Sequence, residues 1–229
     1  MTLNVQHGRG VDRKVNLERI ALMIEREKID IVGLNEVDCY FSRRSFFEDQ
    51  GEWLANRLKM NYVFGPAIQT GPKRNRKYGN ALLSRYPILS HHNLIFRFKI
   101  PVAEPRSLLE AKVATDERSF KVFVSHLSIH PVLNDRMVRF LWESDHSEPT
   151  IIMGDFNRKP SSNAYRMMSE KLIDCAASNP HFTFPAKKPR SRLDYIFVTD
   201  HFKVIESAVI ESDVSDHLPV VALLEQGLE

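Results

Sequence analysis

A short apolar run that ends in a glycine, an aspartate and an asparagine constrains the fold of this chain more than any other stretch. Residues 151–153 (Ile-Ile-Met) are typical of a buried strand, and Gly154 then frees the backbone. Asp155 and Asn157 follow two positions apart. Side chains at that spacing past a strand end point to the same side, so a carboxylate and an amide can converge on one ligand. Taken alone, the same residues are also typical of an ordinary polar turn.

Four further apolar runs end in side chains that bind metals or transfer protons. They are residues 3–5 (Leu-Asn-Val), 33–37 (Gly-Leu-Asn-Glu-Val), 192–196 (Arg-Leu-Asp-Tyr-Ile) and 215–219 (Ser-Asp-His-Leu-Pro). Together with residues 151–157 they form an ordered set of five motifs. In order and spacing this set resembles the motifs of the endonuclease/exonuclease/phosphatase superfamily, and the resemblance covers Asn4 to Pro219.

The first 34 residues indicate an α/β protein. Residues 2–5 and 29–34 predict strands, and residues 14–26 between them carry apolar side chains at the spacing of an amphipathic helix. The resemblance implies a more specific architecture, a four-layer α/β/β/α sandwich in which two mixed β-sheets pack face to face. The sequence has no repeat, linker or low-complexity tract, so we expect residues 1–229 to form a single catalytic domain.

The remaining periodicity predicts three more helices and seven more strands. The helices are residues 46–58, 134–143 and 163–171, the second capped by Asn134, and the strands are residues 61–64, 81–83, 88–100, 107–114, 120–124, 204–210 and 218–224. Residues 69–77 and 181–192 are basic and aperiodic, so we expect loops there. Because both loops lie near predicted site strands, they are candidates for steering an anionic substrate.

Composition narrows the class of protein. A chain of 229 residues, 43% of them hydrophobic, can bury a sizeable core, and its net charge of +3 says little about partners. Cys39 and Cys175 fit neither a disulfide framework nor a zinc pattern. The sequence shows no apolar run of the roughly 20 residues that a membrane span needs, and no signal peptide. We expect a cytoplasmic monomer, and leave open an extension before Met1.

The resemblance assigns metal binding to Asn4, Glu36 and Asp216. Carboxylate and amide oxygens are ligands that Mg²⁺ or Mn²⁺ prefers, together with water and substrate phosphate. In the family the glutamate that matches Glu36 is the main ligand, the asparagine that matches Asn4 supports it, and Asp216 is expected near the metal. DNA-repair members have an aspartate where this chain has Gln6, and this departure argues against a repair enzyme.

The catalytic residues follow from the same resemblance. His217 is suited to proton transfer, and a carboxylate on its other nitrogen, assigned to Asp194, fixes the tautomer. Either His217 or Asp155 is a candidate to activate the attacking water. Asn157 is expected to hydrogen-bond a phosphoryl oxygen. His126 is expected to contact phosphate or to act as a general acid, with a purely structural histidine as the alternative.

Three residues are candidates for substrate binding. Arg106 can bind a phosphate group through two parallel hydrogen bonds. Tyr78 and Asn80 match phosphate or water contacts in some relatives. The alternatives are a solvated arginine at a strand edge and ordinary turn residues.

We therefore predict a divalent-metal-dependent phosphoesterase that hydrolyses a phosphodiester by in-line attack of an activated water. The enzymatic alternatives are a DNA or RNA nuclease, including one that cleaves abasic sites, and a phospholipid- or inositol-phosphate-type hydrolase. The basic loops keep nucleic acid open as a partner. An alternative of a different class is a non-catalytic binding module on the same fold. That alternative predicts the loss of a site acid or histidine, and none is missing from the motifs.

Overall fold

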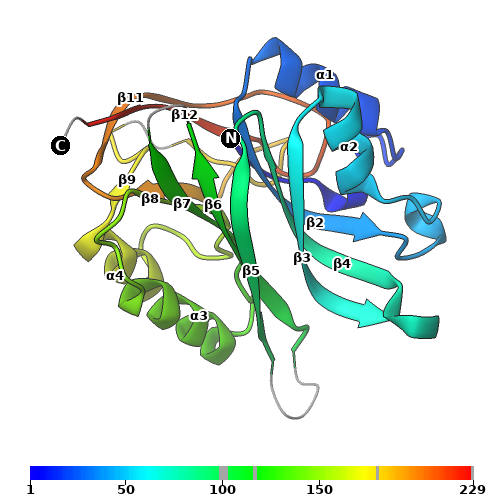
Figure 1. Ribbon diagram of the computed structural model, residues 1–229, viewed down its shortest axis with the longest axis horizontal. Coiled ribbons are helices and arrows are strands. Elements are labelled where there is room, and N and C mark those ends of the chain that lie inside the picture. The colour runs from blue at the N-terminus through cyan, green and yellow to red at the C-terminus, as the bar shows by residue number, and fades with distance from the viewer. Residues whose placement is uncertain (98–102, 116–117, 179–180, 228–229) are drawn as a thin grey trace.

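The computed structural model describes residues 1–97, 103–115, 118–178 and 181–227. Two mixed six-stranded sheets pack face to face, and the four α-helices found among these residues cover their outer faces (Figure 1). This arrangement confirms the expected α/β/β/α sandwich. The end of the strand predicted at residues 88–100 lies partly outside the described residues.

The first sheet has the strand order β11–β12–β1–β2–β4–β3. Its strands are β1 (Thr2–Asn4), β2 (Ile31–Cys39), β3 (Asn61–Thr70), β4 (Arg76–Ser84), β11 (Phe202–Val209) and β12 (Val220–Gln226). Strands β1 and β2 are parallel, and the other neighbouring pairs are antiparallel. Helices α1 (Leu17–Arg26) and α2 (Gln50–Leu58) cover its outer face.

The second sheet has the strand order β5–β6–β7–β8–β10–β9. Its strands are β5 (Ile88–Phe96), β6 (Arg106–Ala114), β7 (Ser119–His126), β8 (Thr150–Asp155), β9 (Ile173–Asp174) and β10 (Asp194–Val198). Here β7 and β8 form the parallel pair. Helices α3 (Pro131–Glu143) and α4 (Asn163–Lys171) lie on its outer face (Figure 1).

Three apolar layers hold the sandwich together, one under each helix pair and one between the sheets. The period-two alternation of strand side chains distributes the residues of β8 between two of these layers. Ile151 and Met153 lie in the layer between the sheets, whereas Ile152 packs in the layer of α3 and α4. The side chain of Asp155 points to the same face of β8 as those of Ile151 and Met153. Its carboxylate therefore lies at the end of the inter-sheet layer.

A β-bulge in β2 interrupts that alternation at the predicted metal ligand. Leu34 pairs with Ala81 of β4 and Val37 pairs with Gly79, so β2 has one more residue than its partner in this interval. Glu36 has a φ of 60°. Val32, Leu34 and Val37 all belong to the α1/α2 layer. In an unbroken strand Glu36 would share the face of Val32 and Leu34, and the extra residue gives this face to Val37 and releases Glu36 from it.

The predicted start of α2 is wrong. The helix begins at Gln50 rather than at residue 46, because the side chain of Asp49 caps it by accepting a hydrogen bond from the backbone N–H of Glu52. Phe46 and Phe47, which the apolar pattern included in the helix, have φ values of 56° and 54° and lie in the left-handed region.

The prediction that Asn134 caps α3 is also wrong. The helix begins at Pro131, and Asn134 lies within its first turns. Its Nδ2 donates to the backbone oxygens of Ser128 and Phe156. The buried amide therefore joins two loops after strands. The loop predicted at residues 69–77 is shorter than expected, since β3 extends to Thr70 and β4 begins at Arg76.

Gly154 of β8 lies against the backbone of Ser125 on β7, with no room for a side chain. Its φ is 146°, and a Cβ atom built on it would lie 1.8 Å from the backbone oxygen of Ser125. We expect Gly154→Ala to lower the free energy of unfolding by about 3 kcal/mol or more, measured by urea denaturation.

The matched control is Gly227→Ala, whose Cβ would meet the backbone oxygen of His201 at an ordinary 3.4 Å. This variant should stay within about 1 kcal/mol of the wild type. A Gly154→Ala protein as stable as Gly227→Ala would show that β8 can shift away from β7 at little cost.

Candidate active site

Five strands and the loop before β12 bring the predicted site residues to one end of the sandwich, with Glu36 at the bulge inside β2 and not at a strand end. The residues that meet there are Asn4 of β1, Glu36 of β2, His126 of β7, Asp155 of β8, Asp194 of β10 and His217 before β12. They come from both sheets. Contacts between them therefore depend on how the two sheets face each other.

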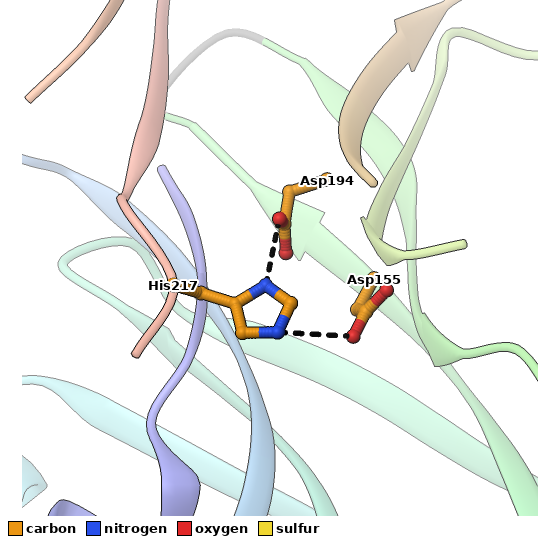
Figure 2. Close-up of side chains that lie close together, drawn as sticks. All are labelled: Asp155, Asp194 and His217. Atoms are coloured by element: carbon orange, nitrogen blue, oxygen red, sulfur yellow. Dashed lines mark hydrogen bonds and ion pairs between the residues drawn. The ribbon is translucent and has the colours of Figure 1, made fainter. Parts of the chain in front are cut away.

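His217 lies between two buried carboxylates (Figure 2). Its Nδ1 is 2.9 Å from Oδ2 of Asp194, and its Nε2 is 3.7 Å from Oδ2 of Asp155. Burial disfavours the imidazolium, but the charges of Asp194, Asp155 and Asp216 outweigh it and raise the pKa of His217 to about 10. Burial and the charge of Asp194 in turn raise the pKa of Asp155 to about 7. The pairing predicted between His217 and Asp194 is present in the structure.

Asn4 bridges two carboxylates. Its Nδ2 lies 3.0 Å from Oε1 of Glu36 and 3.2 Å from Oδ2 of Asp155, so it donates toward both. Its Oδ1 accepts a hydrogen bond from the backbone N–H of Gln6. In this orientation Asn4 supports the carboxylates as a donor. Glu36 is partly exposed, and burial is the main reason that its pKa is raised.

Gln6 donates from Nε2 to Oδ2 of Asp216 over 2.8 Å. Gln6, which stands where DNA-repair members of the family have an aspartate, therefore orients the carboxylate of Asp216. Asp216 is partly exposed, as Glu36 is, and its charge contributes to the raised pKa of Glu36. The two acids thus form an accessible pair beside the buried Asp155.

A small recess is lined by five of the predicted site residues. They are Glu36, Tyr78, Asn80, Arg106 and His126. The Nε of Arg106 is buried and has no hydrogen-bond partner among the described residues, while its Nη1 pairs with Glu104. Nε2 of His126 lies 3.5 Å from Asp155 Oδ2. Burial and the nearby positive charges hold the pKa of His126 well below its usual range, so this histidine is neutral near pH 7.

Asn157 and Asn80 form hydrogen bonds within the protein. Asn157 has a φ of 50°, and its backbone N–H donates to Oδ1 of Asp155 while its Nδ2 donates to the backbone oxygen of Leu127. Asn80 is 1% exposed, accepts from Asn35 and donates to Ser107. The structure thus brings both asparagines to the site as residues that support other groups.

Two residues that the sequence motifs did not identify as site residues also contact the site. The ring of Phe184 lies 4.7 Å from the ring of His217 between centroids. Oδ1 of Asn35 accepts a hydrogen bond from the backbone N–H of Asp155 over 2.9 Å. The position of Asn35 directly before Glu36 was the available signal, whereas no sequence pattern pointed to Phe184.

A separate cavity lies away from these residues. A space of about 580 Å³ opens near Met1, between the start of β2 and the residues of β12, and none of the predicted site residues lines it. Its walls include the apolar side chains of Ile151 and Met153. We therefore place the chemistry at the polar strand ends and not in this space. Among the described residues, no helix combines the length and apolar character that crossing a membrane requires.

Comparison with known proteins identifies relatives of this chain. The model of the Endonuclease/Exonuclease/phosphatase family matches residues 1–217. The uncharacterized protein YbhP of Escherichia coli K12 is 26% identical over 247 aligned positions, which cover 97% of this chain and 94% of YbhP.

Solved structures show the same fold. An endonuclease/exonuclease/phosphatase from Beutenbergia cavernae superposes with a TM-score of 0.86 at 25% identity, over 99% of this chain and 70% of that one. A mannosyl-6-phosphatase from Bacteroides thetaiotaomicron superposes with a TM-score of 0.75 at 20% identity, over 98% of each chain.

The raised pKa of His217 predicts a pH-dependent stability in the metal-free protein. Because the pKa rises from 6.5 to about 10 on folding, the imidazolium stabilises the folded state fully below about pH 6.5. This contribution is lost as the pH rises toward about 10. In EDTA, the difference in Tm between the wild type and His217→Gln should therefore be largest near pH 6 and shrink toward pH 10.

The exposed His91 of β5 provides the matched control. His91→Gln should give a difference in Tm that does not vary over the same range of pH. A constant difference for His217→Gln as well would contradict an imidazolium held between Asp155 and Asp194.

Proposed function

Because this chain belongs to the endonuclease/exonuclease/phosphatase family, we propose that it is a divalent-metal-dependent phosphodiesterase. The observation that carries this proposal is the constellation of Glu36, Asp155 and His217, with Asp194 on the second nitrogen of the histidine. A phosphoester hydrolase needs charge neutralisation, a positioned water and donors for the phosphoryl oxygens. The strand ends supply groups of each kind.

Glu36 and Asp216 are the residues that would hold Mg²⁺ or Mn²⁺. Both offer carboxylate oxygens, both are partly exposed, and amide donors from Asn4 and Gln6 orient them. Asp155, Asp194 and His217 also have ligand atoms within 4.8 Å of one another. We favour the first pair because Nδ1 of His217 is already bonded to Asp194. When bound, the cation neutralises phosphoryl charge and aids formation of the nucleophile.

Asp155 is the proposed base that orients and deprotonates the attacking water. Its Oδ2 lies within 3.7 Å of Nε2 of both His126 and His217, so a water there meets a carboxylate and two imidazoles. The water oxygen bonds to phosphorus as its proton passes to Asp155. The ester P–O bond then breaks, and the released alcohol takes a proton from solvent. His217 offsets negative charge beside the reacting group.

Arg106 is the proposed phosphate contact. It is 7% exposed, and its side chain lines the recess with Glu36, Tyr78 and His126. Its Nε has no hydrogen-bond partner among the described residues. A buried guanidinium with unused hydrogen-bonding capacity suits a phosphoryl oxygen. Tyr78 borders the same recess, and burial keeps its phenol protonated by raising its pKa.

A small or lipid-like phosphodiester is the favoured substrate. Gln6, bonded to Asp216, stands where repair enzymes of the family carry an aspartate. The basic stretches at residues 73–77 and 187–190 keep a nuclease as the second candidate, because they can bind a phosphate backbone without reading sequence. Arg192, by contrast, is buried and paired with Asp174. The mannosyl-6-phosphatase among the structural relatives makes a phosphomonoester a further substrate to test.

Turnover should require a divalent metal and the proposed site. EDTA should abolish hydrolysis of bis(p-nitrophenyl) phosphate, and Mg²⁺ or Mn²⁺ should restore it. We expect Glu36→Gln and His217→Ala each to lower kcat by about 100-fold or more, since each removes a charged group at the reaction centre. Glu27→Gln and His91→Ala, both away from the site, are the controls. Wild-type turnover in both site variants would refute this site.

Substrate class is tested with the same protein on p-nitrophenyl phosphate, supercoiled plasmid and a duplex with an abasic site. Metal-restored cleavage of the diester with an intact abasic duplex supports the proposed phosphodiesterase. Selective cleavage of the abasic duplex would overturn this preference and make the chain a repair enzyme. No turnover on any substrate would favour a binding module.

Arg106→Met should weaken substrate binding more than the chemical step. Loss of hydrogen bonds to a charged phosphate is expected to raise KM by about 10-fold or more. Arg85→Met is the control, because Arg85 bonds to the backbone of Ile29 and does not line the recess. An unchanged KM with a diester substrate would exclude Arg106 from phosphate binding.

A further inference from the structure

A chain of buried hydrogen bonds runs between the two sheets directly behind the site. The backbone N–H of Asp155 donates to Oδ1 of Asn35 over 2.9 Å, and Nδ2 of Asn35 donates to Oδ1 of Asn80 over 2.8 Å. Nδ2 of Asn80 donates to the backbone oxygen of Ser107 over 2.8 Å, and Oγ of Ser107 donates to the backbone oxygen of Gly65 over 2.8 Å. We call these five residues the amide relay.

The direction of the relay is fixed. A backbone N–H can only donate, so Asn35 must present its oxygen to Asp155 and its nitrogen to Asn80. Asn80 must then present its oxygen to Asn35 and its nitrogen to Ser107. Asn35, Asn80 and Ser107 are each no more than 1% exposed. Water therefore offers no replacement for a lost partner, and removing one amide leaves buried groups unpaired.

The relay crosses the sheet interface repeatedly. It passes from β3 (Gly65) to β6 (Ser107), back to β4 (Asn80) and β2 (Asn35), and then to β8 (Asp155). Gly65, Asn80 and Asn35 are in the first sheet, and Ser107 and Asp155 are in the second. The relay therefore sets the spacing between the sheets at the end that carries the chemistry.

Members of the relay are also chain neighbours of site residues. Asn35 immediately precedes Glu36, and Ser107 immediately follows Arg106. Glu36 is the bulged residue with a φ of 60°, a conformation that costs energy unless its surroundings hold it. The side chain of Asn35 holds the backbone on one side of that bulge. A single set of hydrogen bonds thus links the segments that carry Glu36, Arg106 and Asp155.

We infer that Asn35 is a positioning residue, which, with Asn80, fixes the distance and orientation of Glu36 relative to Asp155 across the two sheets. This inference rests on the proposed function, in which Glu36 holds the cation and Asp155 orients the water. A displacement of about 1 Å between such groups can cost about 100-fold in rate. Neither asparagine needs to touch the substrate to have this effect.

Asn35→Ala and Asn80→Ala test the inference by kinetics. Each should lower kcat by about 10-fold to 100-fold, raise the Mg²⁺ concentration that gives half-maximal activity, and leave KM within about 3-fold of the wild type. Because the two residues act in one relay, the double variant should lose little more activity than the more impaired single variant.

Asn93→Ala is the matched control. Asn93 of β5 also joins the sheets, since its Nδ2 donates to the backbone oxygen of Pro66 on β3 over 3.0 Å, but it adjoins no site residue. This variant should lose stability without a fall in kcat or a change in metal requirement. If Asn35→Ala and Asn80→Ala lower kcat no more than Asn93→Ala at equal loss of Tm, the positioning role is wrong.

A second measurement needs no activity and separates this inference from the proposed function. In ¹⁵N-labelled protein, Asn80→Ala should speed exchange of the Asp155 amide proton by about 10-fold or more, although Asn80 does not bond to Asp155. Asn93→Ala should leave that rate unchanged. An unchanged rate in Asn80→Ala refutes the relay, even if the enzyme is active. Faster exchange in an enzyme without diesterase activity keeps the relay and rejects the proposed function.

Discussion

The burial of two carboxylates around one imidazole is the constraint on which the rest of the structure depends. Asp155 and Asp194 are 1% and 0% exposed, and His217 lies between them. Isolated charges in a protein interior are strongly unfavourable, so they persist only where opposite charge and hydrogen bonds replace water. His217 supplies the opposite charge. Asn4 and the backbone N–H of Asn157 supply hydrogen bonds to Asp155.

Asn4 comes from a part of the chain that only the sandwich brings close to Asp155. Asn4 belongs to the first sheet, whereas Asp155 and Asp194 belong to the second. The apolar layer between the sheets ends at these residues, because Asp155 continues the phase of Ile151 and Met153. A change in the spacing of the sheets would therefore disturb hydrogen bonds and charges together. Gly154 allows the close approach of β7 and β8 that completes this packing.

Exposure divides the acids of the site into two kinds. Glu36 and Asp216 are partly open to solvent and suit a cation that exchanges with its surroundings. Asp155 and Asp194 are buried and hold fixed partners, which suits orientation and proton transfer. The motifs identify all four acids without distinguishing these environments. We propose metal binding for Glu36 and Asp216 because they are partly exposed, and water activation for Asp155 because it is buried.

The sequence by itself determined the α/β class and the residues that carry the site motifs, and its resemblance to the family implied the pairing of His217 with Asp194. Local patterns suffice for these because apolar runs mark strands, and the ordered motifs mark the family. Only the tertiary structure decided the roles of Asn80 and Asn134, since an amide in a turn and a buried amide between elements look alike in sequence. The tertiary structure also decided to which face of β2 the side chain of Glu36 points. Simple alternation would have left Glu36 on the helix-covered face. The extra residue in β2 is recognisable only from the pairing of β2 with β4 in the folded sheet.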